Sequence, residues 1–148
     1  MRLAISFAAI VLTGLAVVAP AAHLFELPNK IAMPENDYFV VQTIYNGWWM
    51  LGIFLPAAFL ANLALAGATG DDTTARRLAI LAAALVAANL VIFFLWTQPG
   101  NSATANWTVR PDNWRSLRQQ WEYSHAVNAA VVFAAFCATT IAALRARP

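Results

Sequence analysis

Four long apolar stretches constrain what this chain folds into more than any other feature of its sequence. They cover about residues 3–25, 39–66, 78–97 and 121–144. Each has the length, ~20 residues or more, with which a helix crosses the ~30 Å hydrocarbon core of a bilayer. A segment in lipid must satisfy its own backbone hydrogen bonds, which favours helices. The sequence therefore predicts an all-α, four-transmembrane-helix bundle, with residues 1–148 forming a single integral membrane domain.

Composition agrees with a membrane protein. Of the 148 residues, 61% are hydrophobic and only 11% are charged, more apolar surface than a soluble domain of this length buries. One alternative concerns the first stretch: Arg2 precedes it, and Ala19-Pro20-Ala21 resembles the cleavage site of a signal peptide. With this stretch retained, Pro20 is expected to bend or break the first helix near its end.

The basic residues predict which side of the membrane each end occupies. Arg76 and Arg77 lie in the short loop between the second and third stretches, and Arg145 and Arg147 lie in the tail. Cytoplasmic loops carry an excess of Lys and Arg, so we expect both termini in the cytoplasm, in a bacterial cytoplasmic membrane. The second outer loop, 98–110, then leads into an extended fourth helix. Because the basic residues flank apolar stretches, the expected partners are membrane lipids and no nucleic acid.

Two mirrored pairs of ionisable residues lie at the ends of the first and fourth apolar stretches. His23 and Glu26 close the first stretch, and Glu122 and His125 open the fourth. In the predicted topology both pairs reach the outer face of the bundle. Ionisable side chains at that depth are costly to place, so they are candidates for a functional site.

Aromatic and amide side chains are expected at the same face. All six Trp and all three Tyr residues fall at or near it, whereas an ordinary aromatic belt marks both interfaces. The sequence therefore predicts an aromatic-lined pocket that opens outward, or a one-sided belt with a packed loop. The candidate substrate-binding residues are His23, Glu26, Gln42, Tyr45, Asn46, Trp49, Trp107, Arg118, Trp121 and Asn128. Arg118 is one turn from Glu122 and is expected to pair with it.

Several kinds of chemistry are compatible with this set of residues. A mononuclear transition metal is one, with His23, Glu26, Glu122 and His125 as ligands, and a haem held by the two histidines is another. A third is acid–base chemistry without a bound cofactor, in which a histidine takes a proton and a carboxylate orients it. In the simplest alternative the carboxylates only form ion pairs with Lys30, Arg118 or the histidines. Polar residues of the inner half, such as Asn62 and Thr139, are expected to form hydrogen bonds between helices.

One region resembles a known family. Its motifs are Pro99-Gly100-Asn101, Trp107, Pro111-Asp112-Asn113-Trp114 and the run from Trp121-Glu122 through His125 to Val127. The chain resembles the anthrone-oxygenase-like family of four-helix membrane proteins, many of which are domains of unknown function. Asn128 stands where members often carry an arginine.

The resemblance implies an oxidoreductase of the monooxygenase type. Its named members convert a methylene between two aromatic rings into a ketone with dioxygen, and resemble oxygenases that use no cofactor. His125 is then the expected catalytic base with Glu122 orienting it, and Asn46, Tyr45 or His23 is expected to hold an enolate oxygen. The substrate is expected to be a lipophilic aromatic or quinone-like molecule. Two other functions stay open: a non-catalytic accessory subunit or ligand-binding protein of a larger membrane complex, and a metal-binding membrane protein. The possible protein partners are subunits of such a complex or further copies of this chain.

Overall fold

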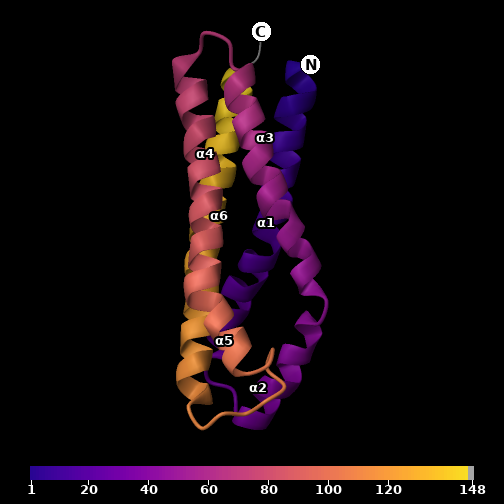
Figure 1. Ribbon diagram of the computed structural model, residues 1–148, viewed down its shortest axis with the longest axis vertical. Coiled ribbons are helices and arrows are strands. Elements are labelled where there is room, and N and C mark those ends of the chain that lie inside the picture. Colours follow the sequence, from indigo (N-terminus) through magenta and orange to yellow (C-terminus); the bar gives the residue numbers. More distant parts are fainter. Residues whose placement is uncertain (147–148) are drawn as a thin grey trace.

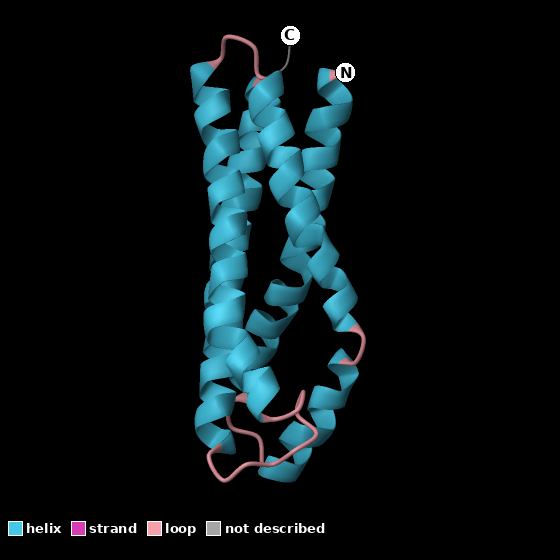
Figure 2. Ribbon diagram, in the orientation of Figure 1, coloured by secondary structure: helices cyan, strands magenta, loops and turns pink. Residues whose placement is uncertain are grey.

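The structure is a computed structural model that describes residues 1–146, and Figure 2 shows helices and loops with no strand in that part of the chain. Four helices form the bundle: α1 (Arg2–Lys30), α3 (Phe54–Ala68), α4 (Thr73–Ile92) and α6 (Trp114–Arg145). They pack in a ring, with α1 against α3 and α6, and α4 against α3 and α6. Four helical stretches are long and apolar enough to cross a membrane: Arg2–Lys30, Trp48–Ala68, Thr73–Ala103 and Trp114–Arg145. The predicted all-α architecture with four membrane-length helices is confirmed.

Both termini and the short α3–α4 loop lie at one end of the bundle (Figure 1). The opposite end carries α2 (Glu35–Gln42), α5 (Gln98–Ala103) and the loop that leads to α6. We call it the distal end. It corresponds to the face that the sequence predicts to lie outside, and the side of the membrane stays a prediction.

Small residues let the helices approach closely in the half of the bundle near the termini. The buried core there includes Ala9, Ala79 and Ala142. Asn62 on α3 links the helices, because its Nδ2 donates to Thr13 Oγ1 at 2.9 Å and its Oδ1 accepts from Thr139 Oγ1 at 2.8 Å. Such hydrogen bonds between membrane helices are the role that the sequence predicts for Asn62 and Thr139.

The predicted second helix, 39–66, is not continuous. The 3₁₀ turn η1 (Thr43–Tyr45) follows α2, and the chain then breaks at Gly47, whose φ of 88° is left-handed. Glycine takes that conformation without steric cost. A 3₁₀ segment, η2 (Trp48–Ile53), leads from there into α3. Pro56 therefore lies in the first turn of α3, where a helix tolerates proline.

The other three spans are longer than predicted. The helix α1 continues past Pro20 and Pro28 to Lys30, so of the bend or break expected at Pro20 the break does not occur. The helix α4 passes into a π-helical turn, η3 (Phe93–Thr97), and then into α5 within the predicted loop 98–110. The helix α6 begins directly after Asn113, as the prediction of an extended fourth helix requires.

The loop after α5 folds back toward the bundle through a run of unusual backbone. Ala105, Asn106 and Trp107 have φ values of 46°, 55° and 64°. Three consecutive left-handed residues other than glycine are strained, and such strain persists only where surrounding contacts hold it. Thr104 supplies two of them: its Oγ1 accepts from the Trp107 amide at 3.0 Å, and its carbonyl accepts from the Val109 amide at 2.9 Å. The loop thereby buries Trp107.

Candidate functional site

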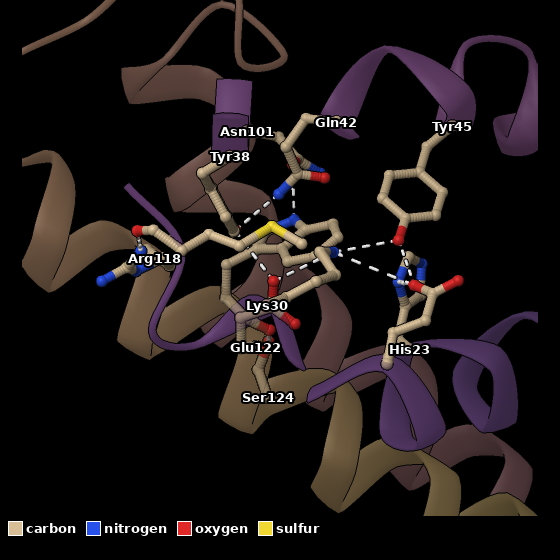
Figure 3. Close-up of polar contacts among 12 residues, drawn as sticks. His23, Lys30, Tyr38, Gln42, Tyr45, Asn101, Arg118, Glu122 and Ser124 are labelled. Carbon is tan, nitrogen blue, oxygen red and sulfur yellow. Dashed lines mark hydrogen bonds and ion pairs between the residues drawn. The ribbon is translucent and has the colours of Figure 1, made fainter. Parts of the chain in front are cut away.

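A buried lysine lies at the centre of the polar residues of the distal end (Figure 3). Lys30, in the last turn of α1, has 2% of its surface exposed, and Glu122 on α6 has none. The Lys30 Nζ lies 3.0 Å from Glu122 Oε1 and 4.0 Å from Glu26 Oε2, and it donates to the Tyr45 hydroxyl at 2.9 Å. The single ammonium therefore interacts with both carboxylates. A buried charge needs such a partner, because burying it unpaired is costly.

Tyrosine hydroxyls complete the shell around the two carboxylates. The Tyr38 hydroxyl donates to Glu122 Oε1 at 2.9 Å and accepts from Gln42 Nε2 at 2.5 Å. The Tyr45 hydroxyl donates to Glu26. Burial, and after it the negative charge of Glu122, raise the pKa of Tyr38 above its ordinary value, so this phenol stays protonated and remains a donor.

The predicted pair of Arg118 with Glu122 does not form. Arg118 NH1 donates instead to the Met33 carbonyl at 2.7 Å, and its guanidinium lies 4.7 Å from the centre of the Trp114 ring. Helix spacing alone would pair Glu122 with Arg118, but Glu122 forms its ion pair with Lys30. Arg118 thus fixes the chain between α1 and α2 onto an aromatic cluster made up of Tyr38, Phe39, Trp107, Trp114 and Trp121.

The two histidines lie against each other. The centres of the His23 and His125 rings are 4.1 Å apart, and Trp121 packs edge-on against both rings, at 4.8 and 4.3 Å. Glu122 was expected to orient His125, but its carboxylate faces Lys30 and Tyr38. The histidine that lies close to a carboxylate is His23, whose Nδ1 is 3.8 Å from Glu26 Oε2.

A cavity of about 670 Å³ adjoins the histidine pair. Nine of the predicted site residues line it: His23, Gln42, Tyr45, Asn46, Trp49, Trp107, Trp121, His125 and Asn128. The other three, Glu26, Arg118 and Glu122, are absent from its wall because they belong to the network around Lys30 and to the loop contact just described. The remaining wall is mainly apolar and comes chiefly from α1, η2, α4 and η3, with further residues from α3, α5 and two loops.

Unpartnered polar atoms concentrate on this cavity. In the part of the chain that the structure describes, seven buried side-chain nitrogen or oxygen atoms have no hydrogen-bond partner in the protein. Five of them belong to cavity-lining residues: His23 Nδ1, Gln42 Oε1, Trp107 Nε1, His125 Nδ1 and Asn128 Oδ1. Buried polar groups are almost always hydrogen-bonded, so these exceptions among the lining residues make the cavity a candidate binding site.

The four residues proposed as metal ligands are not arranged as one site. Within residues 1–146, no group of three or more His, Cys, Asp and Glu side chains is placed to hold a metal ion. The Lys30 ammonium lies within 4.0 Å of both carboxylates, and the histidine rings face each other instead of a shared centre. Rings in such contact also leave no room for a porphyrin between them.

The sequence does not predict that Lys30 and Tyr38 lie at the centre of the site. It offers Lys30 only as one possible ion-pair partner of the carboxylates, and in the structure Lys30 pairs with Glu122. A signal was nevertheless present, since His23, Glu26 and Lys30 are three and four residues apart and share one helical face. Tyr38 precedes Gln42 by one helical turn and lies on the same face.

Comparison with known proteins gives no match: no family model, no curated protein and no solved structure matches this chain. The resemblance to anthrone oxygenases therefore stays a prediction, and the geometry of the site carries the functional argument.

Proposed function

We propose that this chain is an integral membrane enzyme that binds a lipophilic aromatic or quinone-like molecule in the distal cavity and oxidises it with dioxygen. The observation that carries the proposal is an apolar cavity of about 670 Å³ whose lining residues include five with a buried polar atom that has no hydrogen-bond partner. Pockets for ligands of a few hundred daltons measure roughly 300–1,000 Å³ and combine apolar walls with a few aimed polar groups. We place the cavity on the outer side of a bacterial cytoplasmic membrane, with both termini inside.

The wall suits a planar ring system that bears oxygen. Trp121, Trp48 and Phe93 supply flat apolar surface. The Trp107 indole N–H is a buried donor without a partner, and Asn128 Oδ1 is a buried acceptor without one. An aromatic molecule with a carbonyl at one edge and a hydroxyl at another would satisfy both atoms.

The histidine pair supplies the acid–base chemistry of this proposal. In the deprotonation step a neutral imidazole, which we assign to His125, takes a proton from a methylene between two rings, and the C–H electron pair stays on the substrate as an enolate. The Trp107 N–H stabilises the enolate oxygen. The carbanion then bonds to dioxygen, and the peroxide anion takes back the proton. Loss of water breaks the O–O bond and leaves the ketone, so that R₂CH₂ and O₂ give R₂C=O and H₂O.

A glycine in the cavity wall provides the test. A Cβ at Gly52 meets no atom within 4 Å, so a phenylalanine there is expected to fill the cavity without straining the backbone. We expect Gly52→Phe to weaken the binding of anthraquinone by at least about tenfold, or about 1.4 kcal/mol. The measurement is quenching of tryptophan fluorescence by anthraquinone in lipid nanodiscs.

Gly67→Phe is the matched control. A Cβ at Gly67 also meets nothing within 4 Å, and this residue does not line the cavity. Its affinity for anthraquinone should equal that of the wild type. Equal affinities in all three proteins, or no saturable binding to the wild type, would contradict the proposed site.

A further inference from the structure

The cavity changes character along the axis of the bundle. Its distal end is polar, with Gln42, Asn101 and Trp107 in the wall. Its other end, toward the middle of the bundle, is mainly apolar, with Leu15, Leu55 and Leu90 in the wall beside Asn89. On α1 the wall runs from Leu15 to His23, which is about 12 Å of helix at 1.5 Å per residue. A ligand that fits the whole cavity therefore has a polar end and a long apolar end.

The mouth of this cavity faces the side of the bundle. Trp49 and Phe94 line the cavity and are nevertheless 82% and 62% exposed. They belong to η2 and η3, and these two segments border the same cavity without an extended contact between them in the described chain. The segment η2 packs only on α1 and α3 to any extent. Exposed residues that line the cavity thus lie on η2 on one side and on η3 on the other, and both segments belong to stretches apolar enough to cross a membrane.

The backbone is irregular on both sides of the mouth. The η2 side is a 3₁₀ segment that follows the left-handed Gly47, and the η3 side is a single π-helical turn. Both departures from α-helical hydrogen bonding are frequent at hinges and functional sites. In lipid, such irregular backbone is tolerated where it lines a cavity. The two segments therefore mark this opening as a built feature of the fold.

From this geometry we infer that the ligand is a planar, oxygen-bearing ring system with a long alkyl or isoprenoid tail, which enters from the bilayer between η2 and η3. The ring lies against the histidine pair and Trp107, and the tail lies along Leu15, Leu55 and Leu90. This inference rests on the proposed function for the location of the binding site, and it adds the ligand class and the route of access. Separate experiments test the route by which the ligand enters and the reaction that it undergoes.

Photolabelling locates the tail. The probe is a decyl-tailed dimethoxybenzoquinone with a diazirine at the tail end, in nanodiscs, with and without excess unlabelled decylubiquinone. We expect competable adducts in residues 12–20, 51–59 and 86–92. Competable adducts in residues 98–113 would mean that the tail points toward the distal end, and this result would overturn the inference. Adducts that excess quinone does not reduce would overturn it too, since they mean only lipid-facing contact.

Kinetics test the route. We would place a cysteine at Phe94 in a Cys137→Ala background, because Cys137 is exposed, and alkylate it with N-cyclohexylmaleimide. Obstruction of the mouth should slow decylubiquinone association by about tenfold, because the ligand must pass the alkylated side chain to reach the cavity. The control is the same alkylation at Val109→Cys, in the exposed distal loop, which should leave the association rate unchanged. Slowing at Val109 with none at Phe94 would place access on the aqueous side and refute the lateral route.

The results separate this inference from the proposed function. If anthraquinone binds competitively but the tail is not found along Leu15, Leu55 and Leu90, the tailed class is wrong and the proposed function stands. If no planar molecule binds with sensitivity to Gly52→Phe, both fail.

Discussion

Replacement of Lys30 by methionine is expected to destabilise the protein by about 3–5 kcal/mol, the usual cost of removing one partner of a buried ion pair. Glu122 is completely buried and contacts Lys30 Nζ at 3.0 Å, so the substitution leaves its charge without a counterion. Methionine keeps much of the length and apolar stem of lysine, which limits the cavity created. The measurement is unfolding in mixed detergent micelles, followed by tryptophan fluorescence.

Restoration by a second substitution distinguishes a lost charge from lost packing. Lys30→Met with Glu122→Gln should recover most of the stability, because the amide oxygen of glutamine still accepts from Tyr38 and neither member of the former ion pair is charged. As a matched control, Arg145→Met removes the ion pair with Asp72 at 3.2 Å, which is exposed and therefore contributes little. A double variant no more stable than Lys30→Met would show that the ion pair is not what holds α1 to α6 at this end.

Substitution of His125 by alanine is expected to lower the rate of anthrone oxidation by about 10²–10⁴-fold, the usual contribution of a positioned general base. His125 lines the cavity with an unpartnered Nδ1 and contacts the His23 and Trp121 rings. Because the substitution enlarges the cavity without removing an anchoring hydrogen bond, affinity for anthraquinone should change only a few-fold. Oxygen uptake and quinone absorbance would be measured in nanodiscs.

Tyr123→Ala on the same helix serves as the control, since Tyr123 is half-exposed and does not line the cavity. It should keep the wild-type rate. Full anthrone oxidation by His125→Ala would contradict the assignment of the base. Oxidation that falls equally in both variants would indicate a general loss of structure.

The sequence was sufficient to predict the four spans because lipid imposes a long, uninterrupted apolar pattern on each of them. It was also sufficient to predict that His23 and His125 lie at the same end of the bundle, because successive spans run in opposite directions. The break of the second span at Gly47 was missed, although glycine next to two bulky tryptophans was a usable signal. Hydropathy does not distinguish α-helical from 3₁₀ or π geometry, which depends on what packs beside the segment.

The ion pairs of the site depended on contacts between distant parts of the chain. Spacing along α6 offered Arg118 to Glu122, yet Lys30 from α1 lies closer in space and forms the pair. Helix spacing gives only the neighbours within one helix, and it says nothing of a side chain that arrives from another. In the same way, Trp107 reaches the cavity wall through the left-handed turn at Ala105 to Trp107. The sequence pattern does not predict that turn, so it could not predict the unpartnered indole N–H.

Photolabelling with benzophenone tests most directly whether the distal cavity is the binding site. Benzophenone is a diaryl ketone that inserts into nearby C–H bonds under ultraviolet light, so it reports where an aromatic ketone lies. Mapping of the labelled peptides from nanodiscs should find adducts within residues 48–55, 90–94 and 121–128 that excess anthraquinone abolishes. Adducts spread over the lipid-facing helix surfaces, and unchanged by anthraquinone, would contradict the assignment of this cavity as the site.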